Sequence, residues 1–156
     1  MSDSQPQPPE LKAAERLIGA WEIEATHVGL PGAFIKGQVT FEWLEGRTFL
    51  IQRSRYDHPE IPDAIAITGV TDGRLSMHYF DVRGVHRVLA VSINERQWRF
   101  WGDVGPFHQR FTGKLSQNGD TIEGQSQLSH DGTNWEDDLT ITYRRAADTR
   151  PAQQRP

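Results

Sequence analysis

The sequence contains no cysteine among its 156 residues, which excludes disulfide bonds, thiolate metal sites and thiol-based catalysis. It also lacks any apolar run approaching the roughly 20 residues that a transmembrane helix needs. The first ten residues, MSDSQPQPPE, are polar and carry no apolar segment, which argues against a secretory signal. Net charge is −4 and the arginines are scattered, so no basic stripe predicts a nucleic-acid partner. These absences predict a cytoplasmic protein with no membrane span.

Large aromatic residues are plentiful by contrast, with five Trp and seven Phe in an otherwise polar chain. That combination favours a barrel with a partly polar interior over a dry core. Residues 1–9 and 146–156 are rich in Pro, Gln and polar residues and are expected to be disordered tails, leaving one domain at 10–145. At its start, PELKAAERLIG predicts a short helix that begins at Pro9 and ends at Gly19.

After Gly19 the pattern changes to apolar–polar alternation, interrupted at regular intervals by turn signals. Nine turns would separate ten strands, and most intervals suit an antiparallel meander of tight hairpins. The fold predicted is therefore all-β, a ten-stranded antiparallel up-and-down barrel with the helix near one mouth. The turn signals are Leu30-Pro31-Gly32, Glu45-Gly46, Asp57 to Pro62, Asp72-Gly73, Arg83-Gly84, Asn94-Glu95, Gly105-Pro106, Asn118-Gly119 and Asp131-Gly132.

Five segments, read in order, resemble the lipocalin-like branch of the calycins, a group of small bacterial barrels related to fatty-acid-binding proteins and nitrobindins. The segments are LIGAWEIEA with its Gly-x-Trp, FEWLEG, HYFDVRGVHRV, QRFTG and DGTNWEDDLTITYRR. The resemblance covers roughly residues 10 to 145 and implies a barrel with a small-molecule cavity. It does not transfer a ligand. Fatty-acid-binding proteins use an Arg-x-Tyr pair in the last strand, whereas Tyr143 and Arg144 are adjacent here. Nitrobindins bind haem through a histidine near the C-terminus, and this chain's last strand has none.

Hairpin pairing assigns the faces of the strands, because residues opposite each other share a face. If the loop at Arg83-Gly84 has two or four residues, Phe80 opposes Arg87 and His78 opposes Leu89, and all four face inward with the other apolar side chains. His78 and Arg87 would then be polar groups in an aromatic-lined cavity. The candidate ligand-binding residues are His78, Arg87, Gln52, Gln109, Asp137, Phe41, Trp43, Tyr56, Phe80, Leu89, Trp98, Phe100 and Phe111.

The leading hypothesis is a binding protein that holds a small, mainly hydrophobic ligand, whose polar or anionic end His78 and Arg87 would contact. No cofactor is required. Haem is an alternative ligand for the cavity, because one axial imidazole is sufficient to bind its iron, and His78 or His27 could supply that imidazole. An enzyme using His78 as acid or base is a second alternative. A third is a filled barrel whose outer Trp101 contacts a partner, and a homodimer would be one such case.

Overall fold

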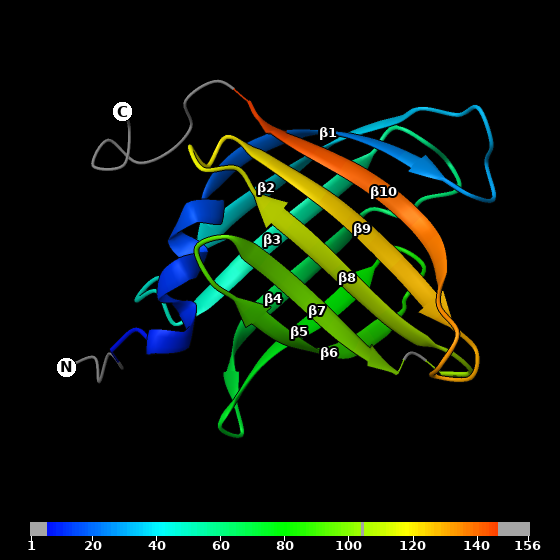
Figure 1. The fold of residues 1–156 in the computed structure, drawn as a ribbon. Coiled ribbons are helices and arrows are strands. Elements are labelled where there is room, and N and C mark those ends of the chain that lie inside the picture. The colour runs from blue at the N-terminus through cyan, green and yellow to red at the C-terminus, as the bar shows by residue number, and fades with distance from the viewer. Residues whose placement is uncertain (1–5, 104, 147–156) are drawn as a thin grey trace.

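Ten antiparallel strands form a closed barrel in a computed structural model that describes residues 6–103 and 105–146 (Figure 1). Each strand pairs with its neighbours along the chain, and the first strand pairs with the last, which closes the barrel. This confirms the predicted fold class. The strands are β1 (Gly19–His27), β2 (Ile35–Trp43), β3 (Phe49–Tyr56), β4 (Ala64–Thr71), β5 (Arg74–Asp81), β6 (His86–Ile93), β7 (Gln97–Asp103), β8 (His108–Leu115), β9 (Thr121–Ser129) and β10 (Glu136–Arg145).

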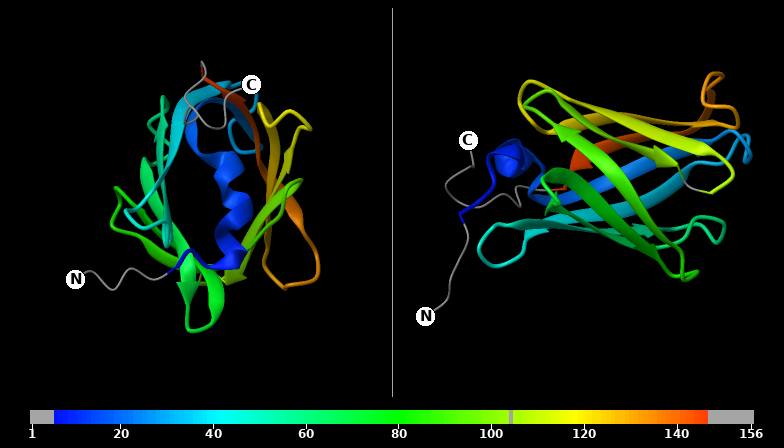
Figure 2. Two further views of the ribbon diagram at one scale, coloured as in Figure 1. Left: turned by 90° about the vertical axis from the view of Figure 1, so that its left-hand side faces the viewer. Right: turned by 90° about the horizontal axis from the view of Figure 1, so that it is seen from below.

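The helix η1 (Pro9–Leu17) lies across one end of the barrel, as expected (Figure 2). It is a 3₁₀ helix, and its buried residues Leu11, Ala14 and Leu17 are spaced by three. Since a 3₁₀ helix has three residues per turn, this spacing aligns the three side chains on the side that faces the barrel. The Trp43 indole donates a hydrogen bond to Glu15 at 2.6 Å and fixes the helix against β2. The helix therefore closes this end, and the opposite end is framed by loops.

All nine predicted turns lie between strands. The tightest joins β4 to β5, where Asp72 and Gly73 both have positive φ, at 52° and 76°. That conformation belongs to the two-residue hairpin turn whose twist matches the flanking strands. A two-residue turn at Asp72-Gly73 predicts the pairs Ile67–His78 and Ile65–Phe80, and both are confirmed. The Asn118-Gly119 turn likewise predicts the pair Leu115–Ile122, which is confirmed as well.

The β5–β6 hairpin differs from the prediction by one residue. Asp81 N–H donates to Val85 O at 3.1 Å, which leaves a three-residue loop ending at Gly84 with φ of 83°. A glycine in this conformation is typical of three-residue hairpin loops. Because the loop is odd in length, Tyr79 opposes Arg87 and Phe80 opposes His86. A shift of one residue moves side chains to the other face, so His78 and Phe80 lie outside, and their inward placement was wrong.

A second difference lies in β10, where the pairing with β9 shifts between Asp137 and Thr140. A β-bulge of this kind reverses the faces of the residues that follow it. Asp137 is exposed and accepts a hydrogen bond from Gln127 Nε2 at 3.0 Å, so its predicted inward placement was wrong. Its neighbour Asp138 faces the interior instead.

Two other hairpins are offset by two residues. The Glu45-Gly46 turn predicts that Phe41 opposes Leu50, and the residue opposite Phe41 is Gln52. The Asn94-Glu95 turn predicts that Val91 opposes Trp98, and the residue opposite Val91 is Phe100. An even offset leaves every face unchanged.

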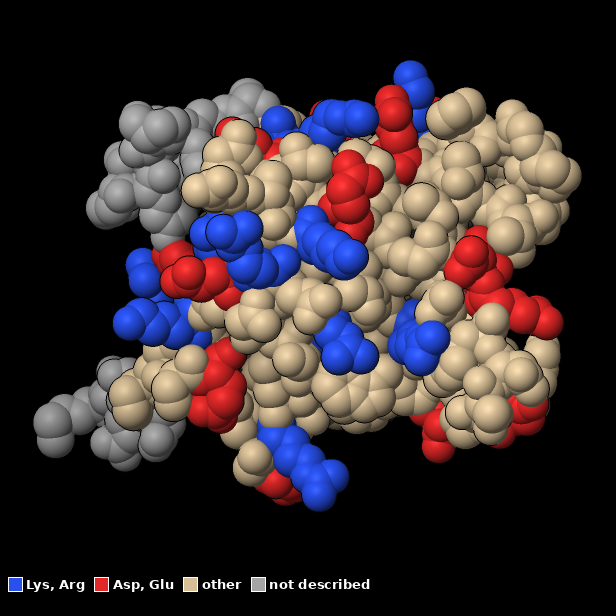
Figure 3. Space-filling view, in the orientation of Figure 1, with Lys and Arg blue, Asp and Glu red and all other residues tan. Residues whose placement is uncertain are grey.

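The surface seen in Figure 3 carries basic and acidic side chains interspersed among neutral ones. Among the described residues, no helix is long and apolar enough to cross a membrane. Most of the two predicted tails, residues 1–5 and 147–156, lies outside the part of the chain that the structure describes.

Candidate functional site

A cavity of about 190 Å³ occupies the half of the barrel away from the helix. Inward-facing residues of β3 to β10 line it, together with two residues of the β3–β4 loop. The strands leave this space because β4 contributes only Ala64 and Ala66 to the wall, while its bulky Ile65 and Ile67 point outward. The lining residues are Gln52, Ser54, Tyr56, Ile61, Pro62, Ala64, Ala66, Met77, Tyr79, Arg87, Leu89, Phe100, Gln109, Phe111, Ser126, Asp138, Leu139, Ile141 and Tyr143.

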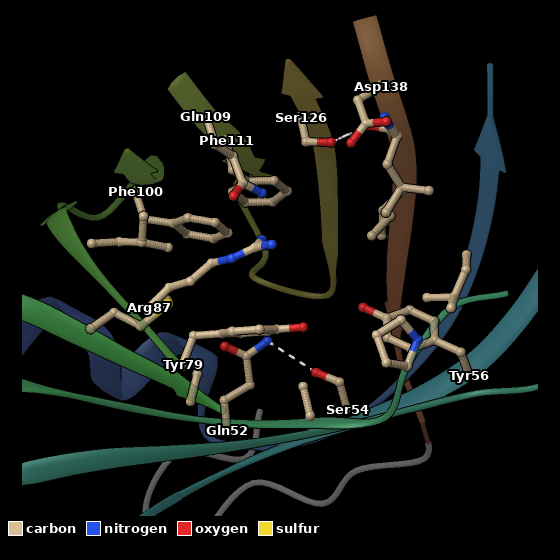
Figure 4. Close-up of a pocket in the computed structure, with 18 of the residues that line it drawn as sticks. Gln52, Ser54, Tyr56, Tyr79, Arg87, Phe100, Gln109, Phe111, Ser126 and Asp138 are labelled. Atoms are coloured by element: carbon tan, nitrogen blue, oxygen red, sulfur yellow. Dashed lines mark hydrogen bonds between the residues drawn. The ribbon is translucent and has the colours of Figure 1, made fainter. Parts of the chain in front are cut away.

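The Arg87 guanidinium reaches into the middle of this cavity (Figure 4). Its carbon lies 5.9 Å from the centre of the Tyr79 ring, close to the limit of a cation–π contact. Within the described residues Arg87 forms no hydrogen bond and no ion pair. A guanidinium offers five N–H donors, and a partly buried one without partners is unfavourable. Arg87 is thus a cation inside the barrel that has no partner among the described side chains and is available to a molecule in the cavity.

Several neutral polar groups accompany Arg87. Gln52 Nε2 donates to Ser54 Oγ at 3.4 Å, a long and therefore weak hydrogen bond. Gln109 Oε1 is buried and accepts no hydrogen bond from the described residues. Burial raises the pKa of the Tyr56 phenol, and a hydrogen bond with Ser54 partly offsets this effect. The cavity therefore offers both donors and an acceptor for a bound molecule, next to one fixed positive charge.

Aromatic rings supply the apolar wall. Phe100 and Phe111 stack with ring centres 4.7 Å apart and planes at 13°. Behind them, toward the helix, Trp98 is 1% exposed and contacts Phe111 edge-on at 5.0 Å. Phe41 packs against Trp98 in turn, at 5.5 Å. This packing makes the helix end of the barrel a solid core, so only the other half is available to a ligand.

One wall is held in place by the buried carboxylate of Asp81. It accepts hydrogen bonds from the Tyr79 hydroxyl at 2.9 Å and from Arg83 Nη2 at 2.7 Å. The bonds from Arg83 lower the pKa of Asp81 well below its usual range, despite its burial. Burial, followed by the bond to Asp81, raises the pKa of Tyr79. The Tyr79 ring is thereby fixed beneath Arg87 (Figure 4).

A second interacting pair, His27 and Asp138, lies at the edge of the cavity, on β1 and β10. His27 Nε2 is 2.6 Å from Asp138 Oδ1, and His27 Nδ1 accepts a hydrogen bond from Gly29 N–H at 2.9 Å. A ring nitrogen that accepts a hydrogen bond carries no proton, so the proton of a neutral His27 is on Nε2, facing Asp138. Both nitrogens of His27 are therefore engaged.

The structure brings most of the predicted site residues together. Seven of the thirteen line the cavity, namely Gln52, Tyr56, Arg87, Leu89, Phe100, Gln109 and Phe111. Phe41 and Trp98 belong to the core behind it, and Trp43 contacts the helix. His78, Phe80 and Asp137 lie outside the barrel. Trp101 is on the outer face, as predicted, and is 39% exposed.

Haem does not fit the histidines of this site. His78 is on the outer surface, and both nitrogens of His27 already have partners. No histidine is among the residues lining the cavity in the described part of the chain. An axial imidazole needs a free nitrogen directed at the iron. The same positions leave His78 without access to the cavity as a general acid or base.

The prediction missed Tyr79, Met77, Ala66 and Asp138 as lining residues. Placing His78 and Phe80 inside, as an even β5–β6 loop requires, puts their neighbours Met77 and Tyr79 outside by the alternation of the strand. The odd loop reverses both. One signal in the sequence favours the odd loop, since Gly84 follows two non-glycine residues, as in a three-residue loop that ends in a left-handed glycine. Asp138 carries no such signal, because nothing in the sequence around it marks the bulge.

No family model and no curated protein matches the chain. Similar solved structures include Rv2717c from M. tuberculosis, with a TM-score of 0.63 and 15% identity over 90% of this chain and 99% of that one. A protein of unknown function from the DUF3598 family of Nostoc punctiforme has a TM-score of 0.58 and 12% identity. The match covers 92% of this chain and 53% of the DUF3598 chain. The redesigned barrel mFAP1, bound to DFHBI, has a TM-score of only 0.45 and 16% identity over 86% of this chain and 99% of that one. At these identities the likeness shows the fold alone, a β-barrel.

Proposed function

We propose that the protein binds a small, mainly hydrophobic molecule with an anionic end in the barrel cavity, and that Arg87 pairs with the anion. The observation that carries the proposal is the position of Arg87, which lies among aromatic rings without a hydrogen-bond or ion-pair partner in the described residues. The cost of placing a charge in such surroundings is offset when an opposite charge pairs with it. The planar guanidinium matches the two oxygens of a carboxylate. We place this binding in the cytoplasm, which fractionation of the source cells would test.

The size of the cavity limits the ligand. A cavity of about 150 Å³ is enough to hold benzene, and the cavity here measures about 190 Å³. A substituted benzene ring or a short branched acid fits this volume, whereas a long-chain fatty acid or haem exceeds it. Phe100 and Phe111 would contact the apolar body of the ligand, and Gln109 Oε1 would accept a hydrogen bond from a ligand hydroxyl or amide.

Calorimetric titration with benzoate and with benzyl alcohol tests the proposal. The two probes are similar in size, and only benzoate carries a charge, so preferential binding of benzoate is the expected result. The side chain of Trp98 contacts two lining rings and provides a second readout, a change in intrinsic fluorescence on saturation. Equal affinity for both probes would refute the role of Arg87. No binding of either probe, together with no binding across a panel of small carboxylates, would refute the proposal itself.

A further inference from the structure

The outer faces of β4, β5 and β6 carry a cluster that the cavity does not explain. We call it the outer patch, and it consists of Ile65, Ile67, His78, Phe80, His86 and Val88. Two rows of paired residues build it, since Phe80 pairs with both Ile65 and His86, and His78 pairs with both Ile67 and Val88. Ile65, Phe80 and Val88 are 41%, 43% and 52% exposed. Large apolar side chains that gather on an exposed face commonly mark an interaction site.

The two histidines of the outer patch have the spacing of metal ligands. His78 Nδ1 and His86 Nε2 are 3.4 Å apart. Zinc binds imidazole nitrogens at about 2.0–2.1 Å in a tetrahedral arrangement, which puts two such nitrogens roughly 3.4 Å from each other. Imidazole is also a ligand that zinc and related transition metals favour. A zinc ion can thus replace the hydrogen bond between these rings with little movement of either nitrogen.

Neighbouring groups fix the two imidazoles in position. The Phe80 ring stacks on His86 at 4.7 Å with an angle of only 4° between the planes. The rings of His78 and His86 are 5.6 Å apart and 15° from parallel. Both histidines lie on paired strands of a closed barrel, so their backbones are held by ladder hydrogen bonds. Ligands that are already held in position lose little conformational freedom when the ion binds.

One copy of the chain supplies only two ligands. No group of three or more potential ligands occurs among the described residues, whereas structural zinc sites are almost always four-coordinate. A second copy related by a two-fold axis through the ion would supply the other two imidazoles, because such an axis brings the same patch from both chains together. The apolar side chains around the histidines would then be buried against their counterparts.

We propose that the outer patch is a zinc-bridged self-association surface, in which His78 and His86 from two copies of the chain hold one ion. The outer patch has only six residues, whereas a stable interface has roughly 20–30 residues on each side. Association is therefore expected to depend on the ion, and not to occur through the apolar contacts alone. This inference is independent of the cavity and of the function proposed for it.

Analytical ultracentrifugation and native mass spectrometry test the proposal directly. Full-length protein stripped with EDTA is expected to sediment as a monomer and to become a dimer when zinc sulfate is added, with one ion shared by two chains. His78→Ala and His86→Ala are each expected to abolish the dimer and the retained zinc. His78→Gln serves as a second variant that keeps a polar side chain of similar bulk. His130→Ala, at an exposed position in the β9–β10 loop, is the matched control and should behave as the wild type.

A Val88→Asp variant separates the metal site from the apolar contacts, because it leaves both imidazoles in place. It is expected to form no dimer and to bind zinc more weakly than the wild type. Three results would overturn the proposal: zinc that remains bound to both alanine variants, zinc bound to a monomer at one ion per chain, or a dimer that persists in EDTA.

Discussion

Replacing Arg87 with methionine should weaken ligand binding and yet stabilise the fold. Methionine keeps a flexible unbranched stem and removes the charged guanidinium. A hydrogen bond to a charged group contributes about 1.5–3 kcal/mol, so the loss corresponds to roughly a ten- to hundredfold weaker affinity for benzoate. Calorimetric titration of the Arg87→Met variant measures this change.

The gain in stability follows from the missing partner of Arg87. A fully buried polar group without a partner costs about 1–3 kcal/mol. Arg87 is only partly buried, so its cost lies near the lower end of that range, and the distant contact with Tyr79 offsets about 0.5 kcal/mol of it. At 5.9 Å this contact is near the limit of its range. Without ligand, Arg87→Met is therefore expected to raise the free energy of unfolding by about 0.5 kcal/mol, or Tm by roughly 1–2 °C for a chain of this size.

Arg99 provides the matched control, since it lies over the Trp101 ring at 5.5 Å on the outside of the barrel. Arg99→Met should leave the affinity for benzoate unchanged. If Arg87→Met binds benzoate as tightly as the wild type, Arg87 does not pair with the anion. A clear fall in the Tm of the ligand-free variant would contradict the expected gain in stability, because it would show that Arg87 already has a stabilising partner.

Three further changes probe the cavity and its support. Ala66→Phe should fill the cavity and abolish benzoate binding, with a near-native Tm in thermal denaturation, because the ring enters existing space. Asp81→Asn should lower the free energy of unfolding at neutral pH by about 1–3 kcal/mol, as measured in urea. The pKa of Asp81 is lower in the folded than in the unfolded state, so ionised Asp81 stabilises the fold fully at pH values above its unfolded-state pKa. This stabilisation is lost as the pH falls through the folded-state pKa. The free energies of unfolding of the wild type and the variant should therefore converge in acid. Gly84→Ala should cost about 1–2 kcal/mol in urea unfolding, because its φ of 83° is unfavourable for other residues.

The architecture could be predicted because its determinants are local. Turn residues recur between apolar–polar segments, and each hairpin can be assigned without knowledge of the others. An error of two residues in the register, as between β6 and β7, leaves the inward-facing and outward-facing residues unchanged. Leu89, Phe100 and Phe111 were therefore placed correctly inside the barrel, and Arg87 was placed there as well.

The site was harder to predict because it depends on single-residue irregularities. One additional loop residue before Gly84 moved His78 outward, and one bulge exchanged Asp137 for Asp138. The assumption that apolar residues face inward also failed in β4. There the inward residues are alanines, and Ile65 lies outside, in the outer patch. Space for a ligand requires small inward side chains, so hydrophobicity alone identifies the wrong face at the cavity.

The most direct test of the central claim is native mass spectrometry of the wild-type protein and the Ala66→Phe variant, both purified gently from the source organism. Ligand binding in the cavity predicts a non-covalent adduct on the wild type, small enough for a cavity of about 190 Å³ and released on unfolding, and no adduct on the variant. A wild-type protein that carries no adduct and gains none after incubation with cell extract would contradict the account, as would an adduct that Ala66→Phe retains.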